Sequence, residues 1–152
     1  MTADDIDIDI DALLDRLRGR IGTQAKPFSR LVEPGALAKL SRATGQTDPL
    51  SLDVANGPVA PPTYLSTFCT EGLAGLFVLD LPLAMFLHTD DVAELGEPIR
   101  GGDTISTRGE LVDVFRKDGR RGAMLFQTAR LILTNQHGAH VATLDVSTAS
   151  FA

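Results

Sequence analysis

The side chains that could exchange protons or bind metal ions near neutral pH are few and widely spaced in this sequence. The histidines are His88, His137 and His140, and the one cysteine is Cys69. His88 lies in an apolar stretch, which favours a structural role, and the other two flank a turn, which favours exposure to solvent. None of them has the helical pairing or the cysteine neighbours of a metal site, so we predict no metal.

Glu71 is a carboxylate inside a segment with helical apolar spacing, residues 63–78. A carboxylate on a helix can act as a general acid or base where it meets a substrate. On the polar side of the same helix it only faces water, and this is the interpretation that the sequence favours. Gly72 and Gly75 would each destabilise such a helix by about 1 kcal/mol relative to alanine, so we expect tertiary burial or a close backbone approach there.

Five of the fourteen basic residues are concentrated around two turns, against an acidic background. They are Arg100, Arg116, Lys117, Arg120 and Arg121. Such charge runs are usually only solvated. Arginine side chains also bind phosphate oxygens through paired hydrogen bonds, so both a solvated turn and a phosphate contact stay open for residues 116–121.

The first half of the chain predicts helices joined by a long loop. Residues 4–20 combine helical apolar spacing with acids first and arginines last, as the helix dipole favours. A short strand at residues 28–32 precedes a second helix that Pro34 opens and Gly45 can end. Residues 46–62 contain the loop-forming sequences Asp48-Pro49, Asn56-Gly57-Pro58 and Pro61-Pro62, and a loop of this length is often functional.

The second half of the chain predicts strands. Residues 103–115, 122–134 and 140–151 alternate and are rich in β-branched residues, and residues 85–92 could add a further strand. The turns between the three long strands are typical of hairpins. Helices followed by an antiparallel meander predict one α+β domain, residues 23–152, preceded by an N-terminal helix within residues 1–22.

Composition excludes several classes of protein. With a formal net charge of −6, the protein lacks the positive field that would attract nucleic acid. One cysteine permits no internal disulfide, and the acidic start has no signal segment, so we expect a cytoplasmic protein. The longest apolar stretch, residues 73–86, is interrupted by Gly75, Asp80 and Pro82 and is too short for a membrane span.

Three motifs occur in order along the chain. They are ATGQTDPL at residues 43–50, VAPPTY at residues 59–64, and Leu87-His88, Glu94, Pro98-Ile99 and Gly102-Asp103 at residues 87–103. They resemble the A-x-G-D-x-N-P-[IL]-H, A-P-P-T-[FY] and L-H-x5-E-x3-P-[IL]-x2-G-D signatures of the MaoC-like (R)-specific enoyl-CoA hydratases and 3-hydroxyacyl dehydratases. The likeness is to their N-terminal, usually non-catalytic half-domain.

This resemblance implies a hotdog fold, in which a long antiparallel sheet wraps around one central helix, here residues 63–78, and which usually pairs with a second hotdog. It implies a role in fatty acid metabolism and a site for an acyl thioester. The residues expected to bind this substrate are Ala60, Pro61, Pro62, Thr63, Tyr64, Arg116, Arg120 and Arg121.

The catalytic positions of the family are changed in this chain. Active members place an Asp and a His five positions apart to hold the water that adds to an enoyl thioester. Gln46 and Ser51 stand at these positions, and neither side chain exchanges a proton usefully near neutral pH. The resemblance therefore implies a subunit that shapes the acyl channel while a partner hotdog supplies the Asp and His.

Three functions remain as alternatives. The first is an acyl-thioester hydratase or dehydratase subunit paired with a catalytic hotdog. The second is a hotdog acyl-CoA thioesterase that uses Glu71, and the third is a non-enzymatic acyl-binding homodimer. In each case coenzyme A or phosphopantetheine carries the substrate and no other cofactor is expected. The uncovered edge of a single hotdog sheet predicts a hetero- or homodimer, without nucleic acid or membrane partners.

Overall fold

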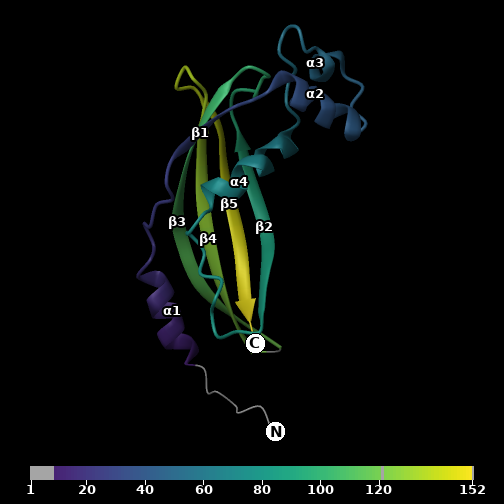
Figure 1. The fold of residues 1–152 in the computed structure, drawn as a ribbon. Coiled ribbons are helices and arrows are strands. Elements are labelled where there is room, and N and C mark those ends of the chain that lie inside the picture. The colour runs from purple at the N-terminus through teal and green to yellow at the C-terminus, as the bar shows by residue number, and fades with distance from the viewer. Residues whose placement is uncertain (1–8, 121, 152) are drawn as a thin grey trace.

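Five antiparallel strands form one long sheet in the order β1-β3-β4-β5-β2 (Figure 1). The strands are β1 (Phe28–Leu31), β2 (Met85–Leu95), β3 (Thr104–Gly119), β4 (Gly122–Thr134) and β5 (His140–Phe151). The computed structural model describes residues 9–120 and 122–151 of the chain. The sheet and the helical segments on one of its faces confirm the α+β fold class.

The three longest strands, β3, β4 and β5, lie at the centre of the sheet. The β3–β4 hairpin sets Gly119 opposite Gly122, and burial alternates along β3 because successive side chains point to opposite faces. The predicted strands at residues 103–115, 122–134, 140–151 and 85–92 are confirmed. The strands β2 and β3 extend a few residues beyond the expected ends, to Leu95 and Gly119.

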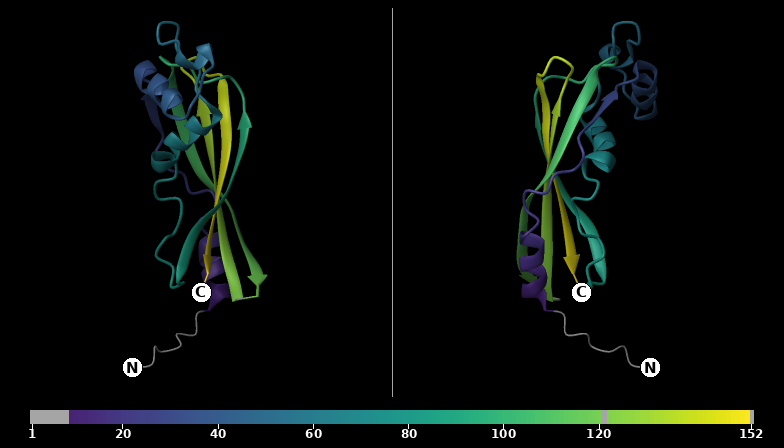
Figure 2. Two further views of the ribbon diagram at one scale, coloured as in Figure 1. Left: turned by 90° about the vertical axis from the view of Figure 1, so that its right-hand side faces the viewer. Right: turned by 60° about the vertical axis from the view of Figure 1, so that its left-hand side comes forward.

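A helical segment crosses one face of the sheet (Figure 2). It consists of the 3-10 helix η1 (Pro62–Phe68) followed by the short helix α4 (Cys69–Gly72). The prediction of one helix over residues 63–78 is therefore wrong in its length, because the helix ends at Gly72 and Gly75 adopts φ +75°.

The close backbone approach expected at the glycines is confirmed. A Cβ on Gly109 of β3 would collide with the carbonyl oxygen of Gly72, so the helical segment rests directly on the sheet. On the other side of this contact, a Cβ on Gly72 would lie 3.0 Å from a methyl group of Leu131. Larger side chains at these two positions would push the helical segment off the sheet.

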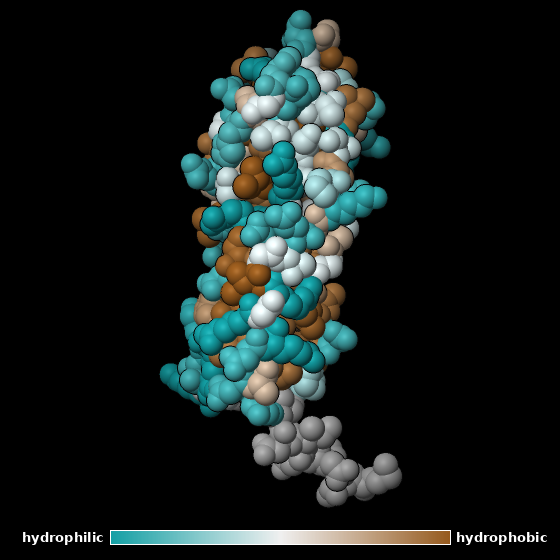
Figure 3. Space-filling model, turned by 90° about the vertical axis from the view of Figure 1, so that its left-hand side faces the viewer, coloured by the Kyte–Doolittle hydropathy of each residue, from teal (hydrophilic) through white to brown (hydrophobic). Residues whose placement is uncertain are grey.

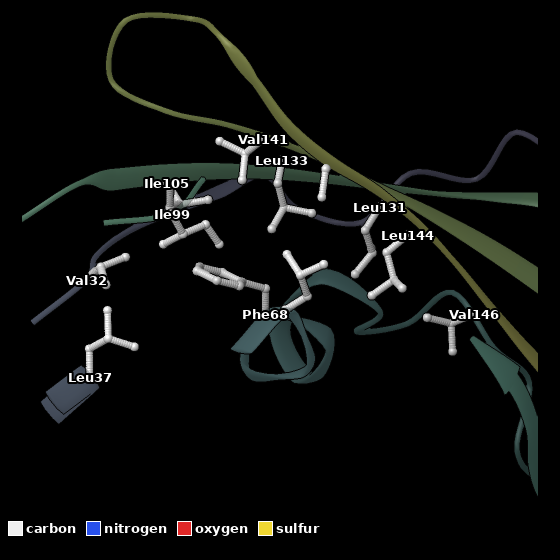
Figure 4. Close-up of a cluster of buried hydrophobic side chains, with 12 residues drawn as sticks. Val32, Leu37, Phe68, Ile99, Ile105, Leu131, Leu133, Val141, Leu144 and Val146 are labelled. Atoms are coloured by element: carbon white, nitrogen blue, oxygen red, sulfur yellow. The ribbon is translucent and has the colours of Figure 1, made fainter. Parts of the chain in front are cut away.

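Phe68 is the centre of the main hydrophobic core. It is fully buried between the sheet and α2 (Pro34–Ala43), and Figure 4 shows its ring between Val32 and Leu37 on one side and the sheet residues on the other. The cluster is completed by Leu65, Ile99, Ile105, Leu131, Leu133, Val141, Ala142, Leu144 and Val146. This core fixes the helical segment in place over β4 and β5.

The N-terminal helix α1 (Ile10–Arg18) packs beside β3 at the other end of the sheet (Figure 1). Its Leu14 and Leu17 are buried against Leu111 and Val114, and the side chain of Asp9 caps the helix by accepting from Ala12 N at 2.9 Å. The first part of the helix predicted for residues 4–20 lies outside the described residues.

The second predicted helix is present as α2, with Pro34 in its first turn and Gly45 at φ +75° after its end. The following loop contains a helical turn that the sequence did not predict, α3 (Pro49–Leu52). The side chain of Asp48 caps it by accepting from Leu50 N at 3.0 Å. Among residues 9–120 and 122–151, no helix combines the length and the apolar character that crossing a membrane requires.

Candidate functional site

A cavity of about 210 Å³ lies where the long loop enters η1. Ala60, Pro61, Pro62 and Leu65 form one wall. The opposite wall is residues 95–99, and Val141 of β5 completes the lining. The Ala60 N–H donates to Ile99 O at 2.9 Å, which holds the two walls together. Glu97 contributes the one ionisable side chain of the lining, so the cavity is suited to an apolar group.

Thr63 and Tyr64, expected beside these residues, lie just outside the cavity lining. Tyr64 packs edge-on against Phe68, with ring centroids 5.8 Å apart, and Thr63 is exposed. Pro61 occupies the cap position of η1, and no side chain caps this helix. Of the five substrate-binding residues expected at positions 60–64, the structure thus brings three, Ala60, Pro61 and Pro62, to one cavity.

Gln46 and Ser51 differ in their surroundings. Gln46 is exposed, and its backbone N–H donates to Ser41 O at 2.9 Å. Ser51 is 9% exposed, and its N–H donates to Asp48 O at 3.0 Å inside α3. The loop reaches the cavity through Val59, whose N–H donates to Leu50 O at 2.9 Å. An amide and a buried hydroxyl therefore stand in the loop that leads to the cavity.

Glu71 lies on the solvent side of α4, as the sequence favours. Its side chain is 59% exposed and pairs with Arg30 of β1, Oε2 to guanidinium at 2.6 Å. The same guanidinium lies 4.9 Å from the ring centroid of Phe68 and donates to Thr67 O at 2.8 Å. These contacts tie β1 to the helical segment, and they give Glu71 a structural partner.

The basic residues of the β3–β4 turn have separate environments. The Arg116 guanidinium donates to Asp118 at 2.9 Å and to Asp11 of α1 at 2.8 Å, and these two carboxylates raise its pKa. Lys117 lies 5.2 Å from the ring centroid of Phe115. Arg120 is exposed, and Arg121 lies outside the described residues. Of the two described arginines expected to bind phosphate, Arg116 is engaged by carboxylates of its own chain, and Arg120 is exposed.

The cavity and the basic turn lie at opposite ends of the sheet. β4 begins beside the turn, with Met124 opposite Phe151, and reaches the level of the cavity at Leu133, opposite Ala142. The strand between these two positions spans roughly 30 Å, at roughly 3.3 Å per residue. Arg100, which belongs to the other of the two basic turns, bridges to Val59 near the cavity. One subunit does not gather all the expected substrate-binding residues around one point.

A β-bulge in β2 creates a contact that sequence reasoning missed. The register shifts between His88 and Asp90, so His88 lies opposite Thr148 and Asp91 opposite Val146, on one face of the sheet. His88 Nε2 and Asp91 Oδ1 are 2.8 Å apart, and both side chains are largely exposed. In a regular strand residues three apart face opposite sides, so the sequence contained no signal for this pair.

Asp91 faces the helical segment across from Cys69. The pKa of the half-buried Cys69 thiol is raised, first by burial and second by the negative charge of Asp91. Within the described part of the chain, no group of three or more His, Cys, Asp or Glu side chains is arranged to hold a metal ion. The imidazole–carboxylate pair could exchange protons, but it lies on the edge strand rather than in the cavity lining.

Comparisons with known proteins agree with the fold. The sequence matches the FAS1-like, dehydratase domain region over residues 20–144. No curated protein matches it. A solved MaoC-like dehydratase is similar to it at 25% identity and a TM-score of 0.75, over 90% of this chain and 43% of that chain. This chain therefore spans less than half the length of that relative.

Two complexes from Mycobacterium tuberculosis contain chains of about the same length. The ChsH1–ChsH2 complex gives 20% identity and a TM-score of 0.68, over 94% of this chain and 96% of that chain. The C-terminally truncated HadBC (3R-hydroxyacyl-ACP dehydratase) complex gives 19% identity and a TM-score of 0.68, over 86% and 96%. The chain belongs to the FAS1-like dehydratase-region family, among the MaoC-like dehydratases with the hotdog fold.

Proposed function

We propose that this chain binds the acyl thioester of a hydratase or dehydratase, and that a catalytic hotdog paired with it supplies the Asp and His that this chain lacks. The observation that carries the proposal is the loop between α2 and η1. It leads into an apolar cavity, and it bears Gln46 and Ser51 where proton exchange would need titrating groups.

Pairing with a second hotdog is supported by the kinds of protein that share the fold. HadBC and ChsH1–ChsH2 are complexes, and the similar MaoC-like dehydratase is a chain more than twice as long as the part that aligns. A thioesterase that uses Glu71 is disfavoured, because this carboxylate is exposed to solvent and paired with Arg30. The proposed role in a hydratase or dehydratase requires no catalytic function of Glu71, in keeping with its exposure and its ion pair with Arg30.

The cavity has room for part of an acyl chain. Its volume of about 210 Å³ exceeds the roughly 150 Å³ of a cavity that binds benzene. Ala60, with its small side chain, forms part of one wall beside Leu65, and Leu95 and Ile99 face them across the cavity. An acyl chain seated here would bury apolar surface against both walls of the cavity.

Arg120 and Arg121 of this chain are proposed to meet the phosphate end of a carrier that is bound to the partner hotdog. The turn lies roughly 30 Å from the cavity of its own chain, measured along β4 at roughly 3.3 Å per residue. If two hotdogs pair through antiparallel edge strands, the turn end of one subunit lies beside the cavity end of the other. Arg120, exposed on its turn, is then available to a carrier bound to the partner.

The test is calorimetric titration of the full chain with hexanoyl-CoA and with coenzyme A alone. Ala60→Leu fills the cavity and should weaken hexanoyl-CoA binding about tenfold, because the displaced acyl carbons lose roughly 0.8 kcal/mol each. Ala55→Leu, at an exposed loop position, is the matched control and should bind as the wild type does. Equal affinity for hexanoyl-CoA and coenzyme A, or no effect of Ala60→Leu, would contradict the proposal.

A further inference from the structure

A second hollow, of about 280 Å³, lies at the end of the sheet where β3 turns into β4. The turn forms its rim, and the ends of β4 and β5 form its floor. Its lining residues are Gly119, Arg120, Gly122, Met124 and Phe151. Roughly 30 Å of β4 separates this hollow from the Ala60 cavity, at roughly 3.3 Å per residue. The two spaces therefore receive different chemical groups.

The floor of this hollow is apolar and faces away from the core. Leu125 is buried in one cluster with Leu14 of α1, so the next residue, Met124, points to the opposite face of the sheet. Phe151 lies directly opposite Met124, and Met85 of β2 lies opposite Phe151 with 47% exposure. Thioether and aromatic side chains in a row favour a flat ring lying against them.

Two glycines keep the space above this floor open. A Cβ on Gly122, which adopts φ +118°, would meet nothing within 4 Å, so a side chain there would extend into free space. A Cβ on Gly119 would lie 3.1 Å from the terminal methyl group of Met124. The rim beside the floor is therefore backbone, and a ligand can reach Met124 past it.

Two cations stand beside this floor. Arg120 lines the hollow and is exposed. Lys117 lies directly opposite Met124, on the same face of the sheet, and its Nζ is 5.2 Å and 5.1 Å from the ring centroids of Phe115 and Phe126. These two rings are stacked 4.9 Å apart and hold the ammonium group at the sheet surface.

The carboxylates at this turn are engaged by a third cation. Arg116 donates to Asp118 at 2.9 Å and to Asp11 at 2.8 Å. Among residues 9–120 and 122–151, no ion pair includes Arg120 or Lys117. Figure 3 faces the β3 side of the molecule, and hydrophilic and hydrophobic side chains lie next to each other at the turn end. The turn thus offers positive charge beside an apolar surface.

This combination selects one class of ligand. Inorganic phosphate would use the cations and leave the floor uncovered, and a plain hydrocarbon would leave the cations unused. A nucleoside phosphate uses both, since its base is a flat ring and arginine binds phosphate oxygens through paired hydrogen bonds. The hollow of about 280 Å³ exceeds the roughly 150 Å³ of a cavity that binds benzene, so it has room for such a base.

We propose that this hollow binds the adenosine bisphosphate end of coenzyme A, with the base on Met124 and Phe151 and the phosphates at Arg120 and Lys117. That a thioester carrier reaches this turn rests on the proposed function. The choice of carrier rests on the hollow itself. Coenzyme A and carrier proteins share the phosphopantetheine arm, but only coenzyme A has a nucleotide, so the substrate is a coenzyme A thioester.

Calorimetric titration of the full-length chain with adenosine 3′,5′-bisphosphate tests the site without any acyl group. The bisphosphate should bind about tenfold more tightly than either adenosine or inorganic phosphate, because each of these leaves half of the hollow unused. Arg120→Gln should weaken bisphosphate binding about tenfold. The matched control is Arg108→Gln, which removes the same charge from an exposed position of β3 opposite Ile132 and should change nothing.

Three results would overturn the inference. Inorganic phosphate that binds as tightly as the bisphosphate would show a site for charge alone. ATP that binds as tightly would show a site that does not select the 3′-phosphate of coenzyme A. Equal effects of Arg120→Gln and Arg108→Gln would place the nucleotide elsewhere on the chain.

Hexanoyl-pantetheine, which lacks the nucleotide, separates this inference from the proposed function. Its binding should be weakened by Ala60→Leu and unchanged by Arg120→Gln. If the bisphosphate fails to bind while hexanoyl-pantetheine still responds to Ala60→Leu, the inference is wrong and the proposed function stands. If the bisphosphate binds at Arg120 while Ala60→Leu leaves hexanoyl-pantetheine binding unchanged, the proposed acyl site is wrong and the nucleotide site stands.

Discussion

At the scale of single residues, Asp91 influences two neighbours, His88 and Cys69. His88 lies on the same face as Asp91 because of the bulge in β2, and Cys69 is distant from Asp91 in the sequence. Asp91 contacts His88 at 2.8 Å, and its negative charge adds to burial in raising the pKa of the Cys69 thiol. The bulge between His88 and Asp90 brings His88 and Asp91 to the same face of the sheet. This small cluster is therefore a sensitive reporter of the geometry between β2 and the helical segment.

We predict that Cys69 reacts slowly with iodoacetamide, because only the thiolate is nucleophilic and the raised pKa delays its formation as the pH increases. Asp91→Asn should move the midpoint of the pH–rate profile downward, while burial keeps it above that of an exposed cysteine. The folded state then retains a proton that the unfolded chain loses, so stability should fall as the pH rises past the ordinary cysteine pKa.

Asp90→Asn is the control for this measurement, since Asp90 faces the other side of the sheet. It should leave the alkylation profile of Cys69 unchanged. An Asp91→Asn profile identical to that of the wild type would contradict the effect of the Asp91 charge on the pKa of Cys69.

Residue-level predictions from sequence succeeded where the signal was local. The solvent-facing position of Glu71 followed from its place on a helical pattern. Its partner Arg30 is 41 positions away in the chain, so no local pattern could indicate the ion pair. The His88–Asp91 contact depends on one extra residue in a strand, which alternation does not reveal.

At the scale of elements, the contact of the helical segment with β3 decides how closely the segment lies on the sheet. Gly109→Ala should lower the free energy of unfolding by about 3 kcal/mol, because its Cβ meets the backbone of Gly72 rather than a flexible side chain. Urea denaturation measures this change. Gly35→Ala in α2, where a Cβ meets nothing within 4 Å, should be neutral or slightly stabilising. Equal stability of the two variants would contradict the packing.

Strands were easier to predict than the central helix. Alternation in residues 103–151 reflects one buried face, and this pattern persists in β3, β4 and β5. The helical apolar spacing of residues 63–78 continued past the true end of the helix, because Leu73, Phe77 and Val78 are partly buried from a turn. Apolar spacing reports burial, and here burial continued after the hydrogen-bonded helix had stopped.

At the scale of the whole molecule, the proposed division of labour places binding and proton transfer on different chains. The cavity of about 210 Å³ and the exposed, acidic edge strand belong to this chain. In the proposal, a partner hotdog supplies the titrating pair of the loop. Sequence motifs predicted the family and the fold. They could not predict that the cavity and the basic turn lie at opposite ends of the sheet, since that separation depends on strand register.

The most direct test of the account is the initial rate of crotonyl-CoA hydration by the isolated full-length chain. A missing general acid or base lowers such rates about 10²- to 10⁴-fold, and both are missing here, so the wild-type chain alone should hydrate crotonyl-CoA negligibly. Gln46→Asp/Ser51→His, which restores titrating groups to the loop, should raise the rate measurably. Robust turnover by the isolated wild-type chain would contradict the account. If His88→Asn then abolished this turnover, the His88–Asp91 pair on β2 would be the catalytic group instead.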